Sequence, residues 1–452
     1  MSKRPVAAII LAAGKGTRMK SDVHKVLHPI AGKPMLMHLL ESVDVLGPAH
    51  KIVVVGSGKE QLEAALAGTD SALVVQEPQL GTGHAVQQAE ARLAGFEGDV
   101  LILYGDVPLV STATMQRMID RLNDEDRPVA VVLGFRPVDP GAYGRIVVDE
   151  NHAIHKMVEF KDAGPAERAV NLCNSGLMAI AAKDLFALLA KVGNANAAGE
   201  YYLPDVVMIA LQQGRKSAVI ETDAEEVAGV NSRAELAAME AQWQARRRRQ
   251  AMEEGATLIA PETVWFAHDT VIGRDVVIEP NVFFATGVTI ADSVIIHGFS
   301  HIEGTNIARG AEIGPFARLR PGTVLEEKSK VGNFVEMKKA RLGKGAKANH
   351  LTYLGDADVG AGANIGAGTI TCNYDGYLKY RTEIGAGAFI GSNSALVAPV
   401  TIGDGAIVAA GSVVTADVHA DALAIARGSQ EVKPNWARRF REVMAAKKAQ
   451  SK

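Results

Sequence analysis

The chain has 452 residues, enough for two or more domains that each bury a hydrophobic core. Its 48 Lys and Arg residues nearly balance its 51 Asp and Glu residues, and the net charge of −3 argues against a general surface for nucleic acid. The two cysteines, Cys173 and Cys372, lack zinc or redox spacing, and no apolar run approaches the roughly twenty residues of a membrane-spanning helix. We therefore expect a cytoplasmic protein without membrane insertion.

Short apolar segments recur at helix-length intervals through the first half of the chain. They lie at 6–11, 51–55, 72–75, 100–103, 129–133 and 218–221. The first is apolar on both faces, which is typical of a parallel sheet covered by helices on both sides. The pattern predicts a Rossmann-like α/β domain whose ligands bind beyond the carboxyl ends of the strands.

The first predicted strand leads into a glycine-rich turn, LAAGKGTRM at 11–19. Gly14 and Gly16 would let the backbone approach a phosphate group closely, while Lys15 and Arg18 add positive charge. The turn matches neither GxGxxG nor the Walker A motif. It predicts a local phosphate site of another kind.

An acidic residue, Asp106, ends the fourth predicted strand in the motif YGD at 104–106. Mg²⁺ prefers oxygen ligands and is commonly bound beside phosphate groups. The position of Asp106 therefore predicts a Mg²⁺ ligand.

Residues 232–254 predict a helical connection between two domains. Ser232 and Glu235 form a capping-box pattern, and Gly255 is a plausible stop. The four arginines at 246–249 suggest nucleic-acid binding, but acidic residues follow them and favour a solvated or inter-domain face.

A six-residue repeat dominates the remainder of the chain. Aliphatic residues return at 384, 390, 396, 402, 408 and 414, and the same rhythm begins near Ile272 and slips by one residue before Ile313. Such a period predicts short parallel strands stacked coil on coil, three hexads to a coil. The basic tail beyond Arg427 is expected to be helical or frayed and to close the last coil.

The rhythm becomes irregular between Met337 and Val359, and residues 371–383 read as a projecting loop. His350, in AKANHLTYLGDA, is the candidate general base, because an imidazole that titrates near neutrality suits deprotonation of an amine. An alternative reads His297, His301 and His350 as zinc ligands. Their spacing, several coils apart, argues against it.

The N-terminal motifs resemble those of sugar-nucleotide pyrophosphorylases. They resemble most closely the bacterial family of bifunctional N-acetylglucosamine-1-phosphate uridylyltransferases and glucosamine-1-phosphate acetyltransferases. The resemblance covers nearly the whole chain and rests on LAAGKGTRM, Lys25, QLGTGHA, YGD, Tyr143-Gly-Arg145, Glu159, Lys161-Asp162, Asn174-Ser-Gly176 and Gly229-Val-Asn231.

The resemblance implies roles for residues of the N-terminal domain. The uridine nucleotide would be held by Leu11, Ala12, Ala13, Gly14, Gln76, Gly81, Thr82, Tyr104 and Gly105, with Lys15, Arg18 and Lys25 around the phosphates. N-acetylglucosamine would contact Gly144, Glu159 and Asn174, and Mg²⁺ would be bound by Asp106 and Asn231. Phe160 and Ser175 depart from the family pattern, which bears on the fine sugar contacts.

For the C-terminal domain the resemblance implies a left-handed parallel β-helix that forms a homotrimer. Arg320 and Lys338 would bind the sugar phosphate, and Tyr353 and Asn364 the amino sugar. Acetyl-CoA would contact Ala367, Asn373, Tyr374, Ser392, Ala410 and Arg427, some of them across a subunit boundary.

These expectations combine into one predicted function. The domain at 255–452 would acetylate glucosamine-1-phosphate, and the domain at 1–231 would couple the product to UTP, yielding UDP-N-acetylglucosamine for cell-envelope polymers such as peptidoglycan and lipopolysaccharide. The alternative is a single-activity nucleotidyltransferase whose β-helix is structural or regulatory. A purely structural solenoid would not explain the phosphate turn or Asp106.

Overall fold

The computed structural model describes residues 4–451 and consists of two compact units, which divide between Arg247 and Arg248. The N-terminal unit contains helices α1 (Met35–Asp44), α2 (Lys59–Ala65), α3 (Thr82–Gln87), α4 (Thr112–Leu122), α5 (Pro165–Arg168), α6 (Ala182–Leu189) and α7 (Asp205–Gln212), with 3-10 turns η1 (Thr17–Met19), η2 (Lys25–Leu27) and η3 (Glu90–Leu93). Helix α8 (Arg233–Glu253) spans the division.

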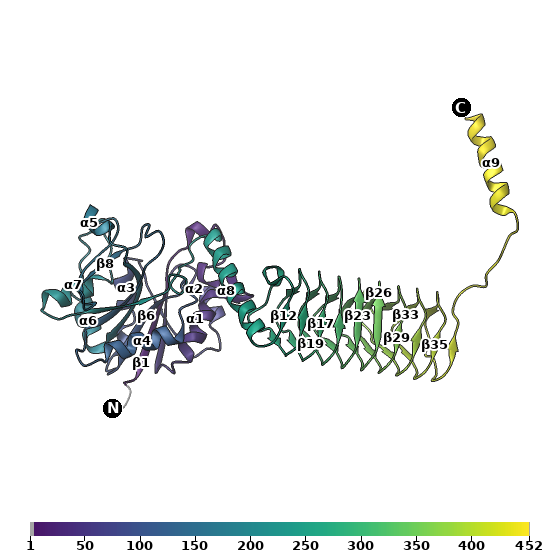
Figure 1. Ribbon diagram of the computed structural model, residues 1–452, viewed down its shortest axis with the longest axis horizontal. Helices are drawn as coiled ribbons and strands as arrows, with labels where there is room; N and C mark the ends of the chain where they lie inside the picture. Colours follow the sequence, from purple (N-terminus) through teal and green to yellow (C-terminus); the bar gives the residue numbers. More distant parts are fainter. Residues whose placement is uncertain (1–3, 452) are drawn as a thin grey trace. The chain divides into compact units, whose positions relative to one another are not determined.

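A central sheet organises the N-terminal unit, in the order β11-β7-β10-β6-β1-β4-β5 (Figure 1). The strands are β1 (Val6–Ala12), β4 (His50–Val55), β5 (Ala72–Val75), β6 (Asp99–Tyr104), β7 (Ala130–Phe135), β10 (Cys173–Ala181) and β11 (Ala218–Thr222); β8 (Arg145–Val148) and β9 (Ile154–Val158) extend it, and β2 (Pro29–Ile30) pairs with β3 (Lys33–Pro34). All six predicted strands are present.

Strand β10 corrects the expectation of a purely parallel sheet. It runs antiparallel to both of its neighbours, β6 and β7. Its sequence, CNSGLMAIA, begins with polar residues and a glycine, so the apolar pattern did not identify it.

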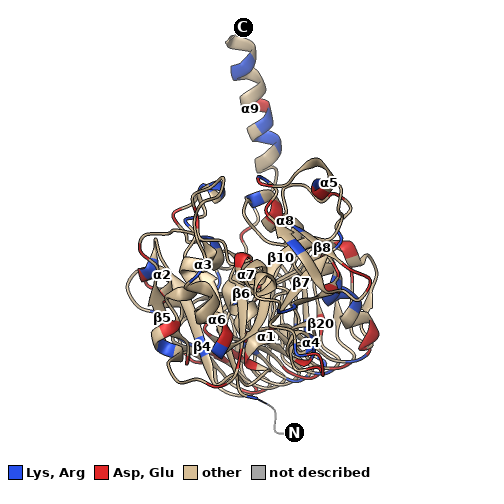
Figure 2. Cartoon of the chain, turned by 90° about the vertical axis from the view of Figure 1, so that its left-hand side faces the viewer, with Lys and Arg blue, Asp and Glu red and all other residues tan. Residues whose placement is uncertain are grey.

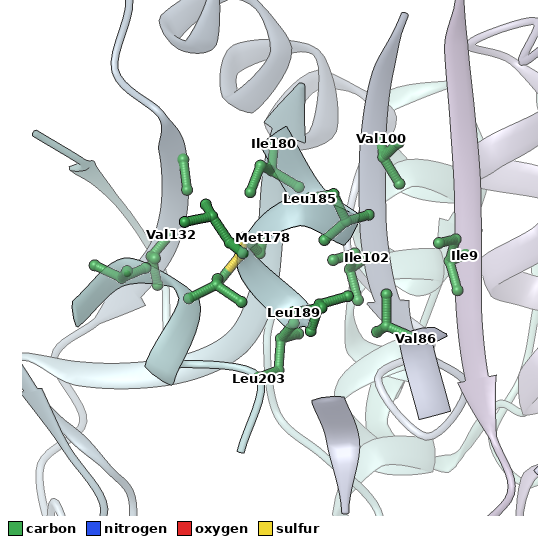
Figure 3. Close-up of a cluster of buried hydrophobic side chains, with 14 of the residues drawn as sticks. Ile9, Val86, Val100, Ile102, Val132, Met178, Ile180, Leu185, Leu189 and Leu203 are labelled. Carbon is green, nitrogen blue, oxygen red and sulfur yellow. The ribbon is translucent and has the colours of Figure 1, made fainter. Parts of the chain in front are cut away.

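Both faces of the sheet are covered, as the apolar pattern of β1 predicted. Ile9 points into a core with Val86 of α3 and Leu185 of α6 (Figure 3). Val206 of α7 is buried in the same core. Ile10 points into the opposite core with α1, α2 and α4. Burial of each such side chain stabilises the fold by about 1.5–3 kcal/mol, so alternation along one strand fixes both layers.

The C-terminal unit is a parallel β-helix with three sheets. The β12 sheet contains β12 (Thr257–Leu258), β14 (Val277–Ile278), β17 (Ile295–Ile296), β20 (Glu312–Ile313), β23 (Lys330–Asn333), β26 (Lys347–His350), β29 (Asn364–Ile365), β32 (Phe389–Ile390), β35 (Ile407–Val408) and β37 (Leu423–Ala424). The β13 sheet contains β13 (Val271–Ile272), β16 (Thr289–Ile290), β19 (Thr305–Ile307), β22 (Thr323–Leu325), β25 (Arg341–Leu342), β28 (Ala357–Val359), β31 (Thr382–Ile384) and β34 (Val400–Ile402). The β15 sheet contains β15 (Phe283–Phe284), β18 (His301–Ile302), β21 (Arg318–Leu319), β24 (Glu336–Lys338), β27 (Tyr353–Gly355), β30 (Ile370–Cys372), β33 (Ala395–Val397) and β36 (Val413–Val414).

The hexad positions face the interior of the β-helix as predicted; Ile290, Ile296 and Ile302 are almost fully buried. The predicted one-residue slip is also present, because Ile296 pairs with Ile313 in the next coil, whereas Ile278 pairs with Ile296.

The six-residue rhythm is broken between Met337 and Val359 as expected, because Leu342 follows Met337 and Val359 follows Leu354 after five residues, but the β-helix itself is continuous. Strands β25 to β28 continue the coils without a break, and Leu342, Ala348 and Leu354 face inward. Two corners of this segment are one residue shorter than in a regular hexad, and the inward position at 348 is an alanine. These changes obscure the six-residue rhythm in the sequence. The other interruption is a genuine projecting loop: Tyr374, Tyr377 and Leu378 are exposed between β30 and β31.

Helix α8 begins with the predicted capping box, in which Glu235 N–H donates to Ser232 Oγ and Glu235 Oε2 accepts from Ser232 N–H. The turn η4 (Pro261–Thr263) follows in the C-terminal unit. The tail is helical as predicted, forming α9 (Trp436–Gln450), which has no buried side chain. Among residues 4–451, no helix combines the length and apolar character needed to cross a membrane.

Candidate functional site

A cavity of about 330 Å³ opens beside the carboxyl ends of β1 and β6. It is lined by Leu11, Ala12, Ala13, Gly14, Lys25, Val26, Gln76, Gln79, Gly81, Thr82, Ala85, Tyr104, Asp106 and Glu200. Most of the predicted nucleotide residues therefore gather at one place. Lys15, Arg18 and Gly105 are not part of the lining.

The lining includes Lys25, whose ammonium group donates to two side-chain oxygens. Lys25 Nζ lies 2.5 Å from Asp106 Oδ2 and 3.1 Å from Asn231 Oδ1. Gly16 permits this arrangement, because it has a φ of +59° and a Cβ there would lie 2.6 Å from Lys25 Cβ. The glycine-rich turn and the acidic strand end thus meet through Lys25.

The oxygen pair of Asp106 and Asn231 fits Mg²⁺. Both oxygens already point at one positive charge, and hard oxygen donors of this kind suit Mg²⁺ that also contacts phosphate oxygens. Within the described part of the chain, no three His, Cys, Asp or Glu residues form a metal-binding group. Two protein ligands would leave positions for phosphate and water.

Gln76 and Tyr104 form the walls of the cavity. The buried Gln76 amide donates to the Gly81 carbonyl at 2.9 Å. Burial raises the pKa of Tyr104, and the carboxylates of Asp106 and Glu159 raise it further. Tyr104 therefore stays a neutral hydroxyl that contacts Thr82.

The predicted sugar residues form a second group at the same end of the sheet. A Cβ on Gly144 would lie 3.2 Å from Glu159 Oε1, and Asn174 N–H donates to the Gly144 carbonyl at 2.9 Å. Burial raises the pKa of Glu159, assisted by the carboxylates of Asp162 and Asp205. Both Glu159 oxygens lie beside Gly144, where a sugar hydroxyl would find a hydrogen-bond partner.

Phe160 does not point to a polar ligand. Its ring lies between the guanidinium groups of Arg145 and Arg168, at 5.5 and 4.5 Å from the ring centroid. Arg145 also donates to the carbonyls of Pro140 and Gly141, so this stack connects the two loops that carry Gly144 and Glu159.

The predicted acetyl-transfer residues lie along one corner of the β-helix, between the β12 and β15 sheets. Equivalent corner positions in successive coils are occupied by His350, Ala367, Ser392 and Ala410. The residue after each of the last three donates its N–H to the corner residue of the coil before: Gly368 to the His350 carbonyl, Asn393 to the Ala367 carbonyl and Gly411 to the Ser392 carbonyl. Arg427 Nη1 donates to the Ala410 carbonyl. This corner forms a continuous track.

Asn333 orients His350 from the preceding coil. His350 Nδ1 lies 2.7 Å from Asn333 Oδ1, and the two residues are register partners in β26 and β23. Because the amide oxygen only accepts, Nδ1 carries the proton and Nε2 keeps its lone pair. The sequence analysis did not identify this partner.

The predicted phosphate residues lie at the next corner, where the β15 sheet strands end. Arg320 donates to Glu336, and Lys338 follows in the next coil. Lys379, in the projecting loop, lies beside Lys338 and lowers its pKa by repulsion between the two positive charges, and the charge of Arg320 adds to the effect. Three cations without enough local anions predict an anionic ligand.

Other predicted residues are distributed around the β-helix. Tyr353 lies on the β15 sheet between the two corners, whereas Asn364 lies in β29 of the β12 sheet. Asn373 is buried and donates to Asp356 Oδ2 at 2.5 Å. Tyr374 is exposed in the loop. One chain therefore does not gather all the predicted acetyl-site residues.

His297 and His301 are engaged away from His350. His297 bonds to Glu279 and Glu312, and His301 stacks on Phe283. Arg246 pairs with Glu225, and Arg248 donates to the carbonyls of two residues in the first coil.

Sequence reasoning missed several residues of the two sites, namely Val26, Gln79, Ala85, Glu200, Asn333 and Lys379. Of these residues, only Asn333 could have been identified from the sequence. It stands one coil before His350 at the same corner, which the hexad count would have identified.

Comparisons with known proteins were made for the whole chain. A model of the MobA-like NTP transferase domain matches residues 8–197, and a model of six bacterial transferase hexapeptide repeats matches residues 381–416. A protein of Rhizorhabdus wittichii named bifunctional protein GlmU is 70% identical over 100% of both chains, and one of the same name from Sphingopyxis alaskensis is 69% identical over 98% of both. A solved CMP:2-keto-3-deoxy-manno-octonic acid synthetase in complex with CTP has a TM-score of 0.42 and 17% identity, and covers 54% of this chain and 99% of its own.

Proposed function

Because the chain belongs to the family of bifunctional GlmU proteins, we infer that it makes UDP-N-acetylglucosamine in two steps, with one step in each domain. The solenoid transfers the acetyl group of acetyl-CoA to glucosamine-1-phosphate. The N-terminal domain transfers the uridylyl group of UTP to N-acetylglucosamine-1-phosphate and releases pyrophosphate. The fold is a Rossmann-like nucleotidyltransferase domain followed by a left-handed parallel β-helix.

We assign residues 1–231 to uridylyl transfer and 255–452 to acetyl transfer, with 232–254 as the helical connection. The observation that carries the first assignment is the cavity in which the glycine-rich turn, Gln76 and Asp106 meet. The uridine would lie against Gln76 and Gly81, and the phosphates against the turn. Lys15 and Arg18 are exposed there and able to neutralise the leaving pyrophosphate.

Asp106 and Asn231 would hold Mg²⁺ in this domain, and the ion would stabilise the negative charge that develops on the phosphate oxygens. The sugar phosphate oxygen attacks the α-phosphorus, and the bond to pyrophosphate breaks. The ammonium group of Lys25 lies beside both residues that would hold the metal, so it would also lie close to the phosphates of UTP. Little acid–base catalysis is required.

His350 is the general base of acetyl transfer. The amine of glucosamine-1-phosphate attacks the thioester carbonyl, forming the C–N bond while the C–S bond breaks and CoA leaves. His350 Nε2 takes the amine proton, because Asn333 holds the other proton on Nδ1. Arg320, Lys338 and Lys379 would bind the sugar phosphate.

Trimer formation is supported by an exposed aromatic ladder, Phe299, Phe316 and Phe334. Their rings stack at 5.0 and 5.2 Å, and each residue is about half exposed at the corner that leads to His350. A soluble chain gains by burying such a ladder against another copy. The separation of Tyr353 from Asn364 supports an acetyl site completed by a second subunit.

Acetyl-CoA would lie along the small residues of the His350 corner, Ala367, Ser392 and Ala410, with Arg427 at its far end. The protein would act in the cytoplasm, where acetyl-CoA and UTP are available. Its product would supply polymers of the cell envelope.

Two variants test the division of labour. Asp106→Ala should abolish pyrophosphate release from UTP and N-acetylglucosamine-1-phosphate while CoA release from acetyl-CoA and glucosamine-1-phosphate continues. His350→Ala should do the reverse. Loss of both activities in either folded variant would contradict the two-site proposal.

The alternative is a nucleotidyltransferase with an inert solenoid. Its discriminating observation is CoA release: if wild-type protein releases CoA no faster than His350→Ala, the acetyltransferase assignment is wrong.

A further inference from the structure

Strand β10 contains a bulge beside the uridylyl-transfer cavity. Asn174 pairs with Gly134 of β7, but the next pair is Met178 with Val132. The residues between, 175–177, therefore face Leu133 alone. A bulge of this kind interrupts the backbone ladder and requires other hydrogen bonds to hold its shape.

The Ser175 side chain supplies those bonds. Its hydroxyl donates to the Leu133 carbonyl at 2.6 Å and accepts from Leu177 N–H at 3.2 Å. It is therefore directed at the backbone of β7 and β10. Ser175, which departs from the family pattern, therefore contacts the backbone of the neighbouring strands rather than the sugar.

The bulge contacts two residues of the site, Asn174 and Tyr104. Asn174 Oδ1 accepts from Gly176 N–H at 2.9 Å, and Asn174 N–H bonds to the Gly144 carbonyl. Gly176 has a φ of +87°, and a Cβ there would lie 2.8 Å from the Tyr104 ring. Movement of the bulge would therefore displace both Asn174 and Tyr104.

We propose that Ser175 is a positioning residue for the sugar end of the uridylyl-transfer site, acting through the bulge that aims Asn174 and seats Gly176 against Tyr104. This inference rests on the proposed placement of N-acetylglucosamine at Gly144, Glu159 and Asn174. Among the residues assigned to UTP, the bulge meets only Tyr104, whereas the first turn and Gln76 lie outside these contacts. The sugar phosphate should therefore respond more strongly than UTP.

The test compares KM for each substrate in full-length protein. Ser175→Ala should raise KM for N-acetylglucosamine-1-phosphate about tenfold, equivalent to about 1.4 kcal/mol, and leave KM for UTP within about twofold. Ser175→Thr, which keeps the hydroxyl, should restore the wild-type value. Acetyl transfer by the same preparation reports on the integrity of the other domain.

Two controls make the result specific. Ser217 is a buried serine just before β11, and its hydroxyl has no hydrogen-bond partner within residues 4–451, so Ser217→Ala should leave both KM values unchanged. Ser175→Val has the shape of Ser175→Thr without the hydroxyl, and this pair gives the answer if Ser175→Ala folds poorly.

An unchanged KM for the sugar phosphate in Ser175→Ala and Ser175→Val would overturn the proposal, as would an equal rise in both KM values. Wild-type protein that does not use N-acetylglucosamine-1-phosphate at all would instead overturn the proposed function on which it rests.

Discussion

One hydrogen bond decides which nitrogen of His350 can act as a base. Asn333 accepts the Nδ1 proton from the coil before, so the reactive Nε2 is presented along the corner track. In the other site, the ammonium group of Lys25 contacts both Asp106 and Asn231. Each of these proposed site residues is thus held by a side chain from another segment of the chain.

Asn333→Ala should reduce kcat for acetyl transfer about tenfold, less than loss of the base itself, which contributes about 10²–10⁴-fold. The reason is loss of ring orientation rather than of the base. Asn333→Asp is the matched variant: a carboxylate beside His350 should preserve orientation and move the acidic limb of the pH–rate profile to higher pH. A wild-type profile and rate in both variants would contradict this role.

At the scale of the element, stacked coils connect through side chains as well as strands. His297 bonds to Glu279 of one neighbouring coil and to Glu312 of the other, and Glu312 also pairs with Lys330. Burial alone would lower the pKa of His297, but hydrogen bonds and charge from the two glutamates outweigh it and raise the pKa. The column of charges thus adds a pH-dependent contribution to coil stacking.

The sign of this contribution follows from linkage. Because the folded pKa of His297 lies above its unfolded value of about 6.5, the stabilisation is complete below that value and is lost as pH rises through the folded pKa. The melting temperature of the solenoid should therefore fall between pH 6 and pH 8 by more in wild type than in His297→Gln. His301→Gln, which changes a histidine stacked on Phe283, is the control and should keep the wild-type slope. Equal slopes in all three proteins would exclude His297 as the source.

At the scale of the molecule, the two activities belong to separate domains, and only acetyl transfer is expected to need an oligomer. The residues proposed for uridylyl transfer line one cavity. The residues proposed for acetyl transfer are spread over two sheets, and His350 lies at the corner that carries the aromatic ladder. Positive and negative residues are interspersed over the protein (Figure 2), so apolar contact rather than opposite charge is the better explanation for assembly.

Replacing Phe299 and Phe316 together with Asn should dissociate the oligomer and abolish acetyl transfer while uridylyl transfer continues. Both residues have a φ near +60°, which Asn adopts readily and Asn281 already adopts at the same corner, so the coils should remain folded. Light scattering coupled to gel filtration gives the mass, and two enzyme assays give the activities. Val271→Asn, at an exposed position on the β13 sheet, is the control. An unchanged mass would show that the ladder is not the interface.

Much of the architecture could be read from periodicity. The recurring apolar segments of the first half of the chain predicted the layered sheet, and the hexads predicted the β-helix with its slip before Ile313. The reading failed where local patterns were masked: β10 begins with polar bulge residues, and Ala348 interrupts the aliphatic rhythm. In both places strand pairing, not the local sequence, decided the structure.

The sequence by itself determined the two folds and the chemical types at their sites, because burial periodicity and the residue classes for phosphate, Mg²⁺ and proton transfer are local properties. Only the tertiary structure shows which side chains contact one another. Asn333 reaches His350, Lys379 reaches Lys338, and Ser175 supports Asn174 from beneath, because hydrogen bonds and charges act through space between segments that the chain order separates.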